Sequence, residues 1–411
     1  MVNNIDSISY ILCKQRGDYQ RDNFDDFLKH IKFHFNIPSI HIAGTNGKGS
    51  TATFLKDIYT ANNYKVGIFN SPDNINEMIK IGGNCIENDY IDKIVNEYKK
   101  QFDKFNLSTF EIETFIAFKW FIDENVDLAI IECGMGGEYD ATNIFTPILS
   151  IITSIGIEHS AFLGQSISEI ALNKAGIIKE YVPTLIGNIS GDALDIIVKK
   201  CKEEGSKLTL LDHYHYLKYE NGQSIFTYRP YNNLRIASLA EYRVIAACLA
   251  VEATNLLKEN FPISEDNLKK GLLYSKLKCR FEFVNENPLI ILDGAHNPEG
   301  IEQLRKEIDK LSINKPIHVV FAAFKDKNIA QMLPEISLVG DVTLTTFDNP
   351  RARKDEDYFL YLDDYHYFDN FEQLITNLIS EYPDDAFLIT GSLAFTYTVR
   401  YYLKNKGIIN G

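Results

Sequence analysis

Cysteine is scarce in this sequence and shows no close pairing. Disulfide scaffolds and zinc knuckles need regularly or closely spaced cysteines, and this chain has no CxxC pair, so both kinds of protein are excluded. We expect free, buried thiols. The six cysteines are Cys13, Cys85, Cys133, Cys201, Cys248 and Cys279.

Long apolar runs and an excess of basic residues are also lacking. The longest apolar stretch, at 147–157, is too short and too interrupted to span a bilayer. The first ten residues lack the basic and apolar regions of a signal peptide. The formal net charge of −14 repels phosphodiester backbones, although a locally positive pocket for a small anion remains open. These absences predict a cytoplasmic protein with no nucleic-acid partner and no membrane partner.

Low-complexity segments and repeats of fixed period are not apparent either. The composition, with 45% hydrophobic and 24% charged residues, is close to the average of soluble globular proteins. A chain of 411 residues is longer than one ordinary domain. We therefore expect two compact domains.

Short β-branched runs recur at the spacing of βα units in the first part of the chain. Several are apolar almost throughout, which is typical of parallel strands covered on both faces, and amphipathic segments at 50–61 and 114–125 lie between them. We predict a doubly wound α/β domain with an added hairpin region near 208–228 and a helix at 240–258. The predicted strands are 39–43, 66–70, 128–132, 148–154 and 184–187.

A second, smaller α/β pattern follows. The polar segment NENP contains Pro288 and interrupts the pattern, so we place a linker at 285–288 between domains at 1–284 and 289–411. The second domain has predicted strands at 289–293, 318–322, 342–346 and 387–390, and covering helices at 302–311 and 371–380.

A strand, a glycine-rich turn and the start of a helix follow one another in SIHIAGTNGKGSTATF. Glycines permit close approach, amides at the helix start can face a polyphosphate, a lysine adds a cation, and a hydroxyl can reach Mg²⁺. An ordinary tight turn is the alternative, but three glycines, a lysine and two hydroxyls favour a nucleotide-binding loop. The candidates are Gly44, Thr45, Asn46, Gly47, Lys48, Gly49, Ser50 and Thr51.

Acidic, histidine and lysine side chains follow later strands. Glu132 ends the predicted strand at 128–132, at the edge where open α/β sheets gather their sites, and a carboxylate there can hold Mg²⁺. A helix cap or a pairing with lysine is its structural alternative. His159 and Lys174 come after the next strand, and a hydrogen-bonded histidine and a surface lysine would explain these two as well.

These motifs resemble a known family. GTNGKGS at 44–50, EHSAFLG at 158–164 followed by KAG, and LDGAHNP at 292–298 are similar, in order and approximate spacing, to motifs of folylpolyglutamate synthases and dihydrofolate synthases in the Mur ligase superfamily. SPDN at 71–74 and KCRFEF at 278–283 add to the match, which runs from about residue 35 to residue 396.

The resemblance implies an ATP-dependent amide ligase with a P-loop N-terminal domain of Mur ligase type and a smaller α/β C-terminal domain. ATP would phosphorylate a carboxylate, and the amine of an incoming amino acid would attack the acyl phosphate to give an amide, ADP and phosphate. The implied substrates are tetrahydrofolate, L-glutamate and ATP, with Mg²⁺ as cofactor. The implied protein is a monomer whose two domains both contact the nucleotide.

The resemblance also implies roles for single residues. The catalytic residues would be Lys48, Glu132, His159 and Lys174, the last carried as a carbamate. The Mg²⁺ ligands would be Ser50, Ser71, Glu132 and His159. The nucleotide would contact the glycine-rich loop together with Arg280, Asp293 and His296. The substrate would contact Phe110, Glu111 and Asp140.

Local structure offers alternatives for several of these roles. Glu111 stands where a helix could start, Arg280 could form a structural salt bridge, and Asp293 could be a turn residue at a strand end.

Some segments depart from the family pattern. Glu241, Tyr242 and Ile245 stand where the family has His-Gln and then Asn-Ala, Asp73 replaces a histidine, and Glu158 replaces an aspartate. The metal and phosphate residues remain, so the changes affect the substrate more than the reaction class. Dihydropteroate as the acceptor, a non-folate carboxylate, and a non-catalytic ATP-binding module are the alternatives.

Overall fold

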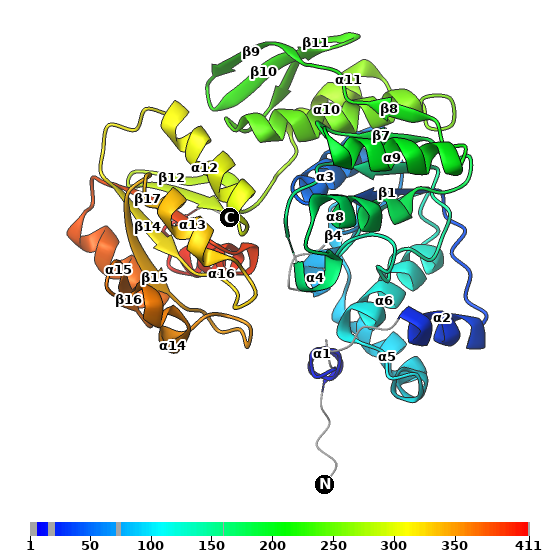
Figure 1. The fold of residues 1–411 in the computed structure, drawn as a ribbon, viewed down its shortest axis with the longest axis horizontal. Helices are drawn as coiled ribbons and strands as arrows, with labels where there is room; N and C mark the ends of the chain where they lie inside the picture. The colour runs from blue at the N-terminus through cyan, green and yellow to red at the C-terminus, as the bar shows by residue number, and fades with distance from the viewer. Residues whose placement is uncertain (1–5, 15–20, 71–74, 159, 410–411) are drawn as a thin grey trace. The chain divides into compact units, whose positions relative to one another are not determined.

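The computed structural model describes residues 6–14, 21–70, 75–158 and 160–409 (Figure 1). The chain forms two compact units. The first comprises Met1–Lys218, Ile225–Ile236 and Arg243–Ser275, and the second comprises Tyr219–Ser224, Ala237–Tyr242 and Lys276–Gly411.

The first unit contains an eight-stranded sheet in the order β4-β3-β2-β5-β1-β6-β7-β8. Strands from β2 to β8 along this order pair in parallel, whereas β3 and β4 add antiparallel at one edge. The predicted doubly wound α/β domain is therefore confirmed. The strands are β1 (Ser39–Ala43), β2 (Val66–Phe69), β3 (Ile79–Ile81), β4 (Asn84–Cys85), β5 (Leu128–Glu132), β6 (Leu149–Ile152), β7 (Thr184–Ile186) and β8 (Leu208–Leu210).

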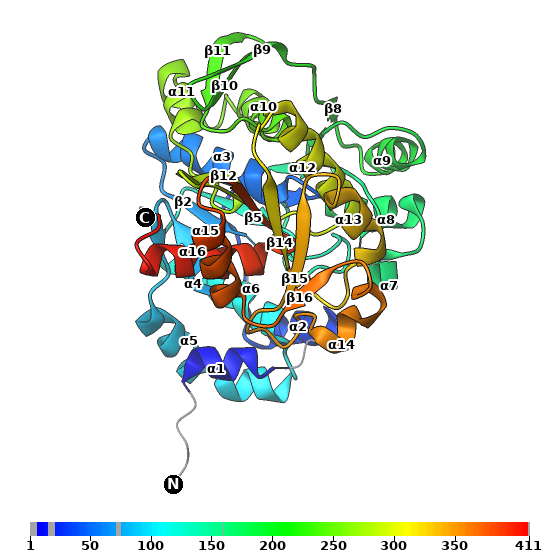
Figure 2. The same ribbon diagram turned by 90° about the vertical axis from the view of Figure 1, so that its left-hand side faces the viewer.

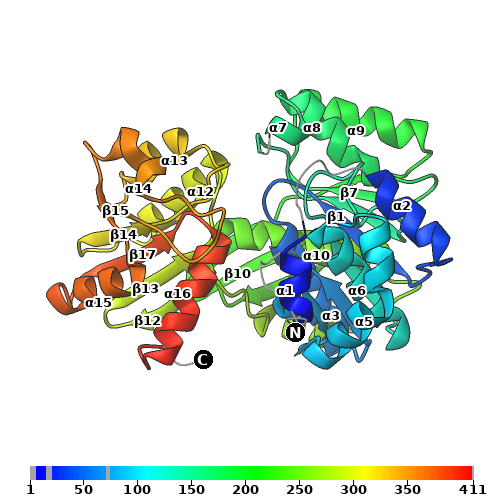
Figure 3. The same ribbon diagram turned by 90° about the horizontal axis from the view of Figure 1, so that it is seen from below.

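Helices bury the central strands of this sheet. Every residue of β1, β2, β5, β6 and β7 is buried, as the apolar runs predict for a sheet with two covered faces. Helices α5 (Asn88–Lys104) and α6 (Thr109–Asp123) form an aromatic-rich core with β2 and β5. Helix α1 (Ser7–Leu12) lies beside both of them (Figure 3). Helix α3 (Lys48–Ala61) contacts β1, β2 and β5 and packs against α11 (Glu265–Leu273).

A small sheet, the largely buried helix α10 and several further helices complete the described chain up to residue 260. Strands β9 (His215–Glu220), β10 (Gln223–Tyr228) and β11 (Tyr231–Ile236) form a three-stranded sheet where the sequence predicts an added hairpin. Helix α10 (Glu241–Leu256) forms close to the predicted 240–258. The remaining helices are α2 (Arg21–His30), α4 (Ile75–Met78), α7 (Ser160–Leu163), α8 (Ile167–Lys174), η1 (Ala175–Ile177) and α9 (Asp192–Glu203).

The second unit is a six-stranded sheet with a hydrophobic core on each face. The strand order is β12-β13-β17-β14-β15-β16, with only β12 antiparallel to its neighbour. Helices α12 (Pro298–Lys310) and α13 (Ile329–Ile336) cover one face, and α15 (Phe371–Glu381) and α16 (Leu393–Asn405) cover the other (Figure 2). The other elements are β12 (Arg280–Glu286), β13 (Leu289–Asp293), β14 (Ile317–Phe321), β15 (Asp341–Thr345), α14 (Asp355–Tyr358), η2 (Phe359–Tyr361), β16 (His366–Phe368) and β17 (Ala386–Thr390).

Residues 285–288, where the sequence suggests a linker, lie in the antiparallel β12–β13 hairpin: Asn285 and Glu286 end β12, and residues 287–288 form the turn. The side chain of Asn285 donates a hydrogen bond of 2.9 Å to the carbonyl of Pro288 across this turn. A polar segment with proline is typical both of tight turns and of linkers, so the sequence alone does not distinguish them. The compact units divide between Ser275 and Lys276 and at two shorter segments upstream.

All six cysteines are free, but they are not all buried. Cys13 and Cys85 are exposed, which corrects the expectation of buried thiols for these two. Within the described part of the chain, none of the helices combines the length and apolar character that crossing a membrane requires.

Candidate functional site

The glycine-rich loop connects β1 to α3, as the sequence predicts. Gly44 and Gly47 have φ angles of 146° and 88°, both in the region that favours glycine. A Cβ atom on Gly44 would lie 2.0 Å from Oγ1 of Thr153. Gly47 is the N-cap of α3 and places no side chain over the helix start. The loop therefore leaves the start of α3, a favourable position for an anion, open to a ligand.

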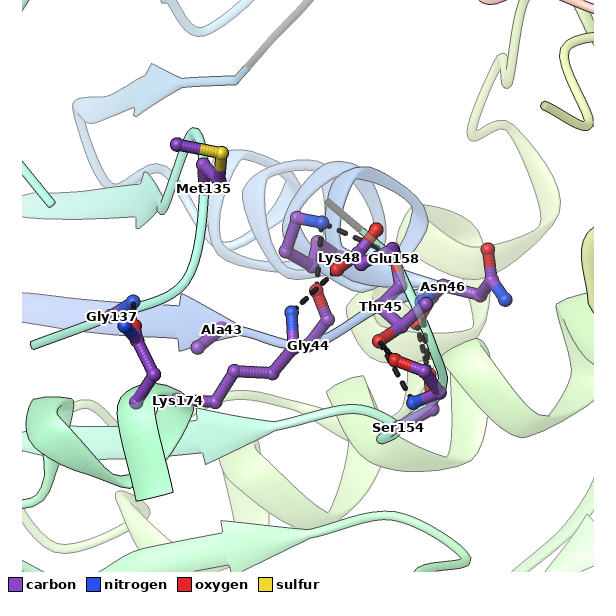
Figure 4. A network of polar contacts seen from close by, with 12 residues as sticks. Ala43, Gly44, Thr45, Asn46, Lys48, Met135, Gly137, Ser154, Glu158 and Lys174 are labelled. Carbon is purple, nitrogen blue, oxygen red and sulfur yellow. Dashed lines mark hydrogen bonds and ion pairs between the residues drawn. The ribbon is translucent and has the colours of Figure 1, made fainter. Parts of the chain in front are cut away.

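Hydrogen bonds attach this loop to the segment that follows β6. The amide of Thr45 donates to the carbonyl of Ser154 at 2.9 Å, and the amide of Asn46 donates to Oγ of Ser154 at 2.9 Å. Oγ1 of Thr153 donates to the carbonyl of Asn46 at 2.6 Å. Figure 4 shows the contacts of Thr45 and Asn46 with Ser154. The backbone of the loop is thereby fixed before any ligand binds.

Lys48 points back over the loop that precedes it. Its Nζ donates to the carbonyls of Gly44 at 2.8 Å and Thr45 at 3.2 Å (Figure 4). A cation in this position lies beside the amides of the turn, where the phosphates of a nucleotide would bind.

Arg243 of α10 contacts the start of α3, and the sequence analysis did not predict this contact. Its guanidinium Nη1 donates to Oγ of Ser50, and the two residues are 2% and 3% exposed. The sequence shows only that Arg243 lies inside the AEYRVIAA segment, which departs from the family pattern, and it does not indicate the contact with Ser50. A buried cation therefore contacts the first turn of α3.

Glu132 lies at the carboxyl end of β5, beside the end of β1. It pairs in register with Ile42, two residues before Gly44, and it is buried. The adjacent parallel strands therefore bring the Glu132 carboxylate to the same edge of the sheet as the loop.

Phe110 and Asp140 meet the glycine-rich segment after β5. The ring of Phe110 passes so close to Gly134 that a Cβ atom there would lie 2.5 Å from it. The Asp140 carboxylate accepts from the amide of Met135 at 2.8 Å and from the Thr142 hydroxyl at 2.5 Å. Burial raises the pKa of Asp140, and these hydrogen bonds oppose the shift. Two of the three predicted substrate residues thus contact one turn.

Glu111 makes a local contact instead. It forms a capping box with Ser108 at the start of α6, in which Oε2 of Glu111 accepts from the Ser108 amide at 2.6 Å. This is the structural alternative that the sequence left open. Its assignment to the substrate remains a prediction.

Lys174 is a fully buried lysine at the end of α8. Its Nζ donates to Oε1 of Glu158 at 2.6 Å (Figure 4). Burial lowers the pKa of Lys174 and the nearby charge of Lys48 adds to this effect, whereas the Glu158 carboxylate opposes it. Lys174 is therefore not a surface lysine.

Two predicted Mg²⁺ ligands, Ser71 and His159, lie outside the described residues. The changed SPDN segment lies outside them as well. In the part of the chain that the structure describes, no three His, Cys, Asp or Glu side chains gather closely enough to hold a metal ion.

The second unit contains the other predicted nucleotide residues. The Asp293 carboxylate accepts from the Tyr242 hydroxyl at 2.8 Å, the Phe281 amide at 2.7 Å and the Ala295 amide at 2.8 Å. Nδ1 of His296 lies 2.8 Å from the carbonyl of Gly294. Arg280 pairs in register with Asp293 across β12 and β13. The second unit therefore brings Arg280 and Asp293 together on adjacent strands, with His296 in the turn that follows.

Family models match both parts of the chain. The Mur ligase middle domain matches residues 42–239, and the Mur ligase glutamate ligase domain matches residues 279–393.

Known proteins are similar over nearly the whole length. A dihydrofolate synthase/folylpolyglutamate synthase of Bacillus subtilis is 33% identical over 400 residues, covering 90% of this chain and 91% of that protein. A folylpolyglutamate synthase of Lacticaseibacillus casei is 29% identical over 384 residues, covering 89% of each. A solved FPGS–AMPPCP–folate complex superposes with a TM-score of 0.84 at 27% identity, covering 97% of this chain and 98% of that one. The chain therefore belongs to the folylpolyglutamate synthase/dihydrofolate synthase family of the Mur ligases.

Proposed function

We propose that the protein is an ATP-dependent amide ligase that adds L-glutamate to a folate, with tetrahydrofolate as the preferred acceptor. The observation that carries this proposal is the loop from β1 to α3, with its two left-handed glycines and Lys48 folded over the turn. The relatives named above, one of them solved with AMPPCP and folate, support the choice of nucleotide and acceptor.

The first chemical step is transfer of the γ-phosphoryl group of ATP to the carboxylate of the acceptor. The Lys48 ammonium and the amides of the loop hold the phosphates and offset the charge that moves during transfer. The products of this step are ADP and an acyl phosphate. The amine of glutamate then attacks the acyl carbon, and the amide forms as inorganic phosphate leaves.

Mg²⁺ is the cofactor we propose for this site, and the donors present suit it. The Glu132 carboxylate and the Ser50 hydroxyl are the hard oxygen donors that Mg²⁺ prefers, and both lie at the edge that carries the loop. We propose Ser71 and His159 as the remaining ligands. When bound, Mg²⁺ would neutralise phosphate charge during transfer.

The acceptor is proposed to contact Phe110 and Asp140. Phe110 offers an aromatic face beside Gly134, and the Asp140 carboxylate is already oriented by Met135 and Thr142. A flat heteroaromatic ring with hydrogen-bond donors suits such a pair, because stacking and a buried acceptor give orientation as well as affinity.

A carbamate on Lys174 is a separate proposal. Burial lowers the pKa of Lys174, and the neutral amine is the form that reacts with carbon dioxide. A carbamate would place a second anion beside Glu158, so it requires a cation at that position. Carbon-13 NMR in labelled bicarbonate tests this, because a carbamate signal must disappear in Lys174→Arg, and its absence from the native protein would exclude the modification.

Dihydropteroate is the second candidate acceptor. The Bacillus subtilis relative carries both activities in its name, and it is the most similar of the relatives described above. We also propose a cytoplasmic monomer, which light scattering and cell fractionation test.

The direct experiment incubates the protein with Mg²⁺-ATP, glutamate and either tetrahydrofolate or dihydropteroate, and measures product masses. A glutamate increment on tetrahydrofolate supports the proposal, and one on dihydropteroate as well makes the enzyme bifunctional. If neither acceptor gains a glutamate, the folate assignment is wrong and a non-folate carboxylate becomes the candidate acceptor. ATP binding without any turnover, unchanged in Glu132→Gln, indicates a non-catalytic module.

A further inference from the structure

An open cavity of about 1070 Å³ lies in the first unit, away from the phosphate loop. Pro38 and Ile148 line it and immediately precede β1 and β6. The cavity therefore opens at the amino ends of these strands, whereas the loop follows the carboxyl end of β1. A strand of that length spans roughly 17 Å, so the two places are distinct.

The lining of this cavity is basic although the chain as a whole has a formal net charge of −14. Among the described residues, four lysines or arginines line it and one acidic residue, Asp25, does so. His34 lies there too. The cations are Arg21 and Lys29 of α2, Lys32 beyond its end, and Lys179 after η1.

These cations are only weakly neutralised by protein carboxylates. Nε of Arg21 lies 3.4 Å from Asp25, and Lys29 pairs at 3.5 Å with Asp26, where both side chains are mostly exposed and screened. Among the described residues Lys32 makes no ion pair.

The positive charges of Arg21 and Lys179 also repel each other. Burial lowers the pKa of Lys179, and the positive charge of Arg21 shifts it the same way, while Glu138 opposes the shift. The Nζ of Lys179 donates to the carbonyl of Gly176 at 2.9 Å. An anion between the two cations would relieve their repulsion.

We propose that this cavity binds a small polyanion that carries phosphate or carboxylate groups. The volume is just above the usual range of about 300–1,000 Å³ for small-molecule pockets and exceeds what a single phosphate needs. Several separated cations match several anionic groups better than one, because each pair forms its own charge-assisted hydrogen bond.

A ligand bound in this cavity would affect the acceptor site through Arg21, and this consequence rests on the proposed function. Arg21 donates from Nη1 to the carbonyl of Glu138 at 2.8 Å and from Nη2 to that of Asn143 at 2.5 Å. These two carbonyls flank the turn that carries Asp140. A ligand that draws the guanidinium into the cavity weakens both bonds and changes the KM of the acceptor.

Equilibrium dialysis tests the binding itself without any turnover. Saturating Mg²⁺-AMPPCP first blocks the phosphate loop, and the probes are radiolabelled pyrophosphate and a γ-linked tetraglutamate peptide. We expect one further equivalent of at least one probe per chain. Binding of pyrophosphate alone identifies a phosphate ligand, and binding of the peptide alone identifies a carboxylate ligand. If neither probe binds beyond the nucleotide site, the proposal is overturned.

Charge reversal at exposed positions locates the site. The double variant Lys29→Glu/Lys32→Glu should weaken probe binding by at least about tenfold, since a tenfold loss needs only about 1.4 kcal/mol. Lys29 is 76% exposed and Lys32 is exposed, so AMPPCP affinity should not change. Lys199→Glu/Lys202→Glu, at two exposed lysines of α9, changes the net charge by the same amount and is the matched control. An equal loss in the control would show that only overall charge matters and would overturn the assignment.

Discussion

At the scale of single residues, we propose that Lys48 makes the most direct contribution to nucleotide binding. Replacing it with methionine removes the ammonium that lies over Gly44 and Thr45. A charge-assisted hydrogen bond to phosphate contributes about 1.5–3 kcal/mol, so ATP affinity should fall by roughly 10- to 150-fold. Calorimetric titration with AMPPCP measures this. The control is the surface variant Lys65→Met, which should bind AMPPCP with the affinity of the native protein. If Lys48→Met also bound AMPPCP with native affinity, Lys48 would not contact the nucleotide.

His41 gives a prediction in pH. It lies buried in β1, 2.9 Å from the Thr142 hydroxyl, and burial lowers its pKa from the ordinary value of 6.5 to about 3, with Lys179 and Arg21 adding to the effect. At pH values between about 3 and 6.5, His41 is protonated in the unfolded chain but neutral in the folded chain. The stability contribution of neutral His41 is therefore present above pH 6.5 and is lost as the pH falls towards 3.

The measurement is urea unfolding at several pH values between these limits. The native protein should lose about 1.4 kcal/mol more per pH unit than His41→Asn, because only the native chain has this difference in proton binding. Subtracting the two curves cancels the contributions of all other groups. Parallel curves would mean that His41 titrates in the folded protein as it does in the unfolded one.

Some residues of this site could be predicted from the sequence, and others could not. Lys48 and Glu132 could be chosen from their place after predicted strands. Arg243 could not, because a buried arginine in an apolar helix gives no sign of which distant hydroxyl it contacts. The same holds for Glu158, whose partner Lys174 lies 16 positions further along the chain.

At the scale of elements, the turn between β1 and α3 is set by its glycines. In Gly44→Ala the new Cβ atom would lie 2.0 Å from Oγ1 of Thr153, in a backbone conformation that disfavours side chains. We expect a loss of about 1–3 kcal/mol in stability, together with loss of nucleotide binding. Urea unfolding and AMPPCP titration measure the two effects.

Gly83→Ala is the control for this variant. No atom lies within 4 Å of a Cβ atom placed there. Its stability should stay within about 0.5 kcal/mol of the native value. Equal stability of the two variants would show that the turn tolerates a side chain.

The helices and strands themselves were largely predictable. Apolar β-branched runs at 39–43 and 128–132 became β1 and β5 with unchanged bounds. The sequence alone does not identify the polar segment at 285–288 as part of a hairpin, because the pairing of β12 with β13 depends on a partner strand whose own pattern is weak. The local sequence shows the hydrophobic periodicity that distinguishes a helix from a strand, whereas the partner of each strand is determined only in the assembled sheet.

At the scale of the whole molecule, we expect Mg²⁺ to be required for catalysis but not for folding. Chelation with EDTA should abolish ligation, because the charge of the phosphates is then unshielded during transfer. The free energy of unfolding without nucleotide should not change, because the described residues include no cluster of metal ligands that could stabilise the fold. Assaying activity and urea unfolding on the same EDTA-treated sample checks both statements. Full activity after chelation would exclude a metal-dependent transfer.

The family and the two-part architecture followed from motifs spread over the chain, whereas the acceptor did not. Phe110 and Asp140 meet one turn, but their positions fit any flat ring with hydrogen-bond donors. Acceptor identity depends on differences in affinity between similar molecules, which the motifs do not encode.

The most direct test of glutamate ligation through an acyl phosphate follows oxygen atoms. Tetrahydrofolate labelled with oxygen-18 in its carboxylates is incubated with the protein, Mg²⁺-ATP and glutamate, and both products are analysed by mass spectrometry. We predict a folate extended by one glutamate and inorganic phosphate that carries one oxygen-18 atom per amide formed. Extended folate with unlabelled phosphate would contradict the acyl phosphate, and labelled tetrahydrofolate recovered unchanged while ATP is consumed would contradict the ligase.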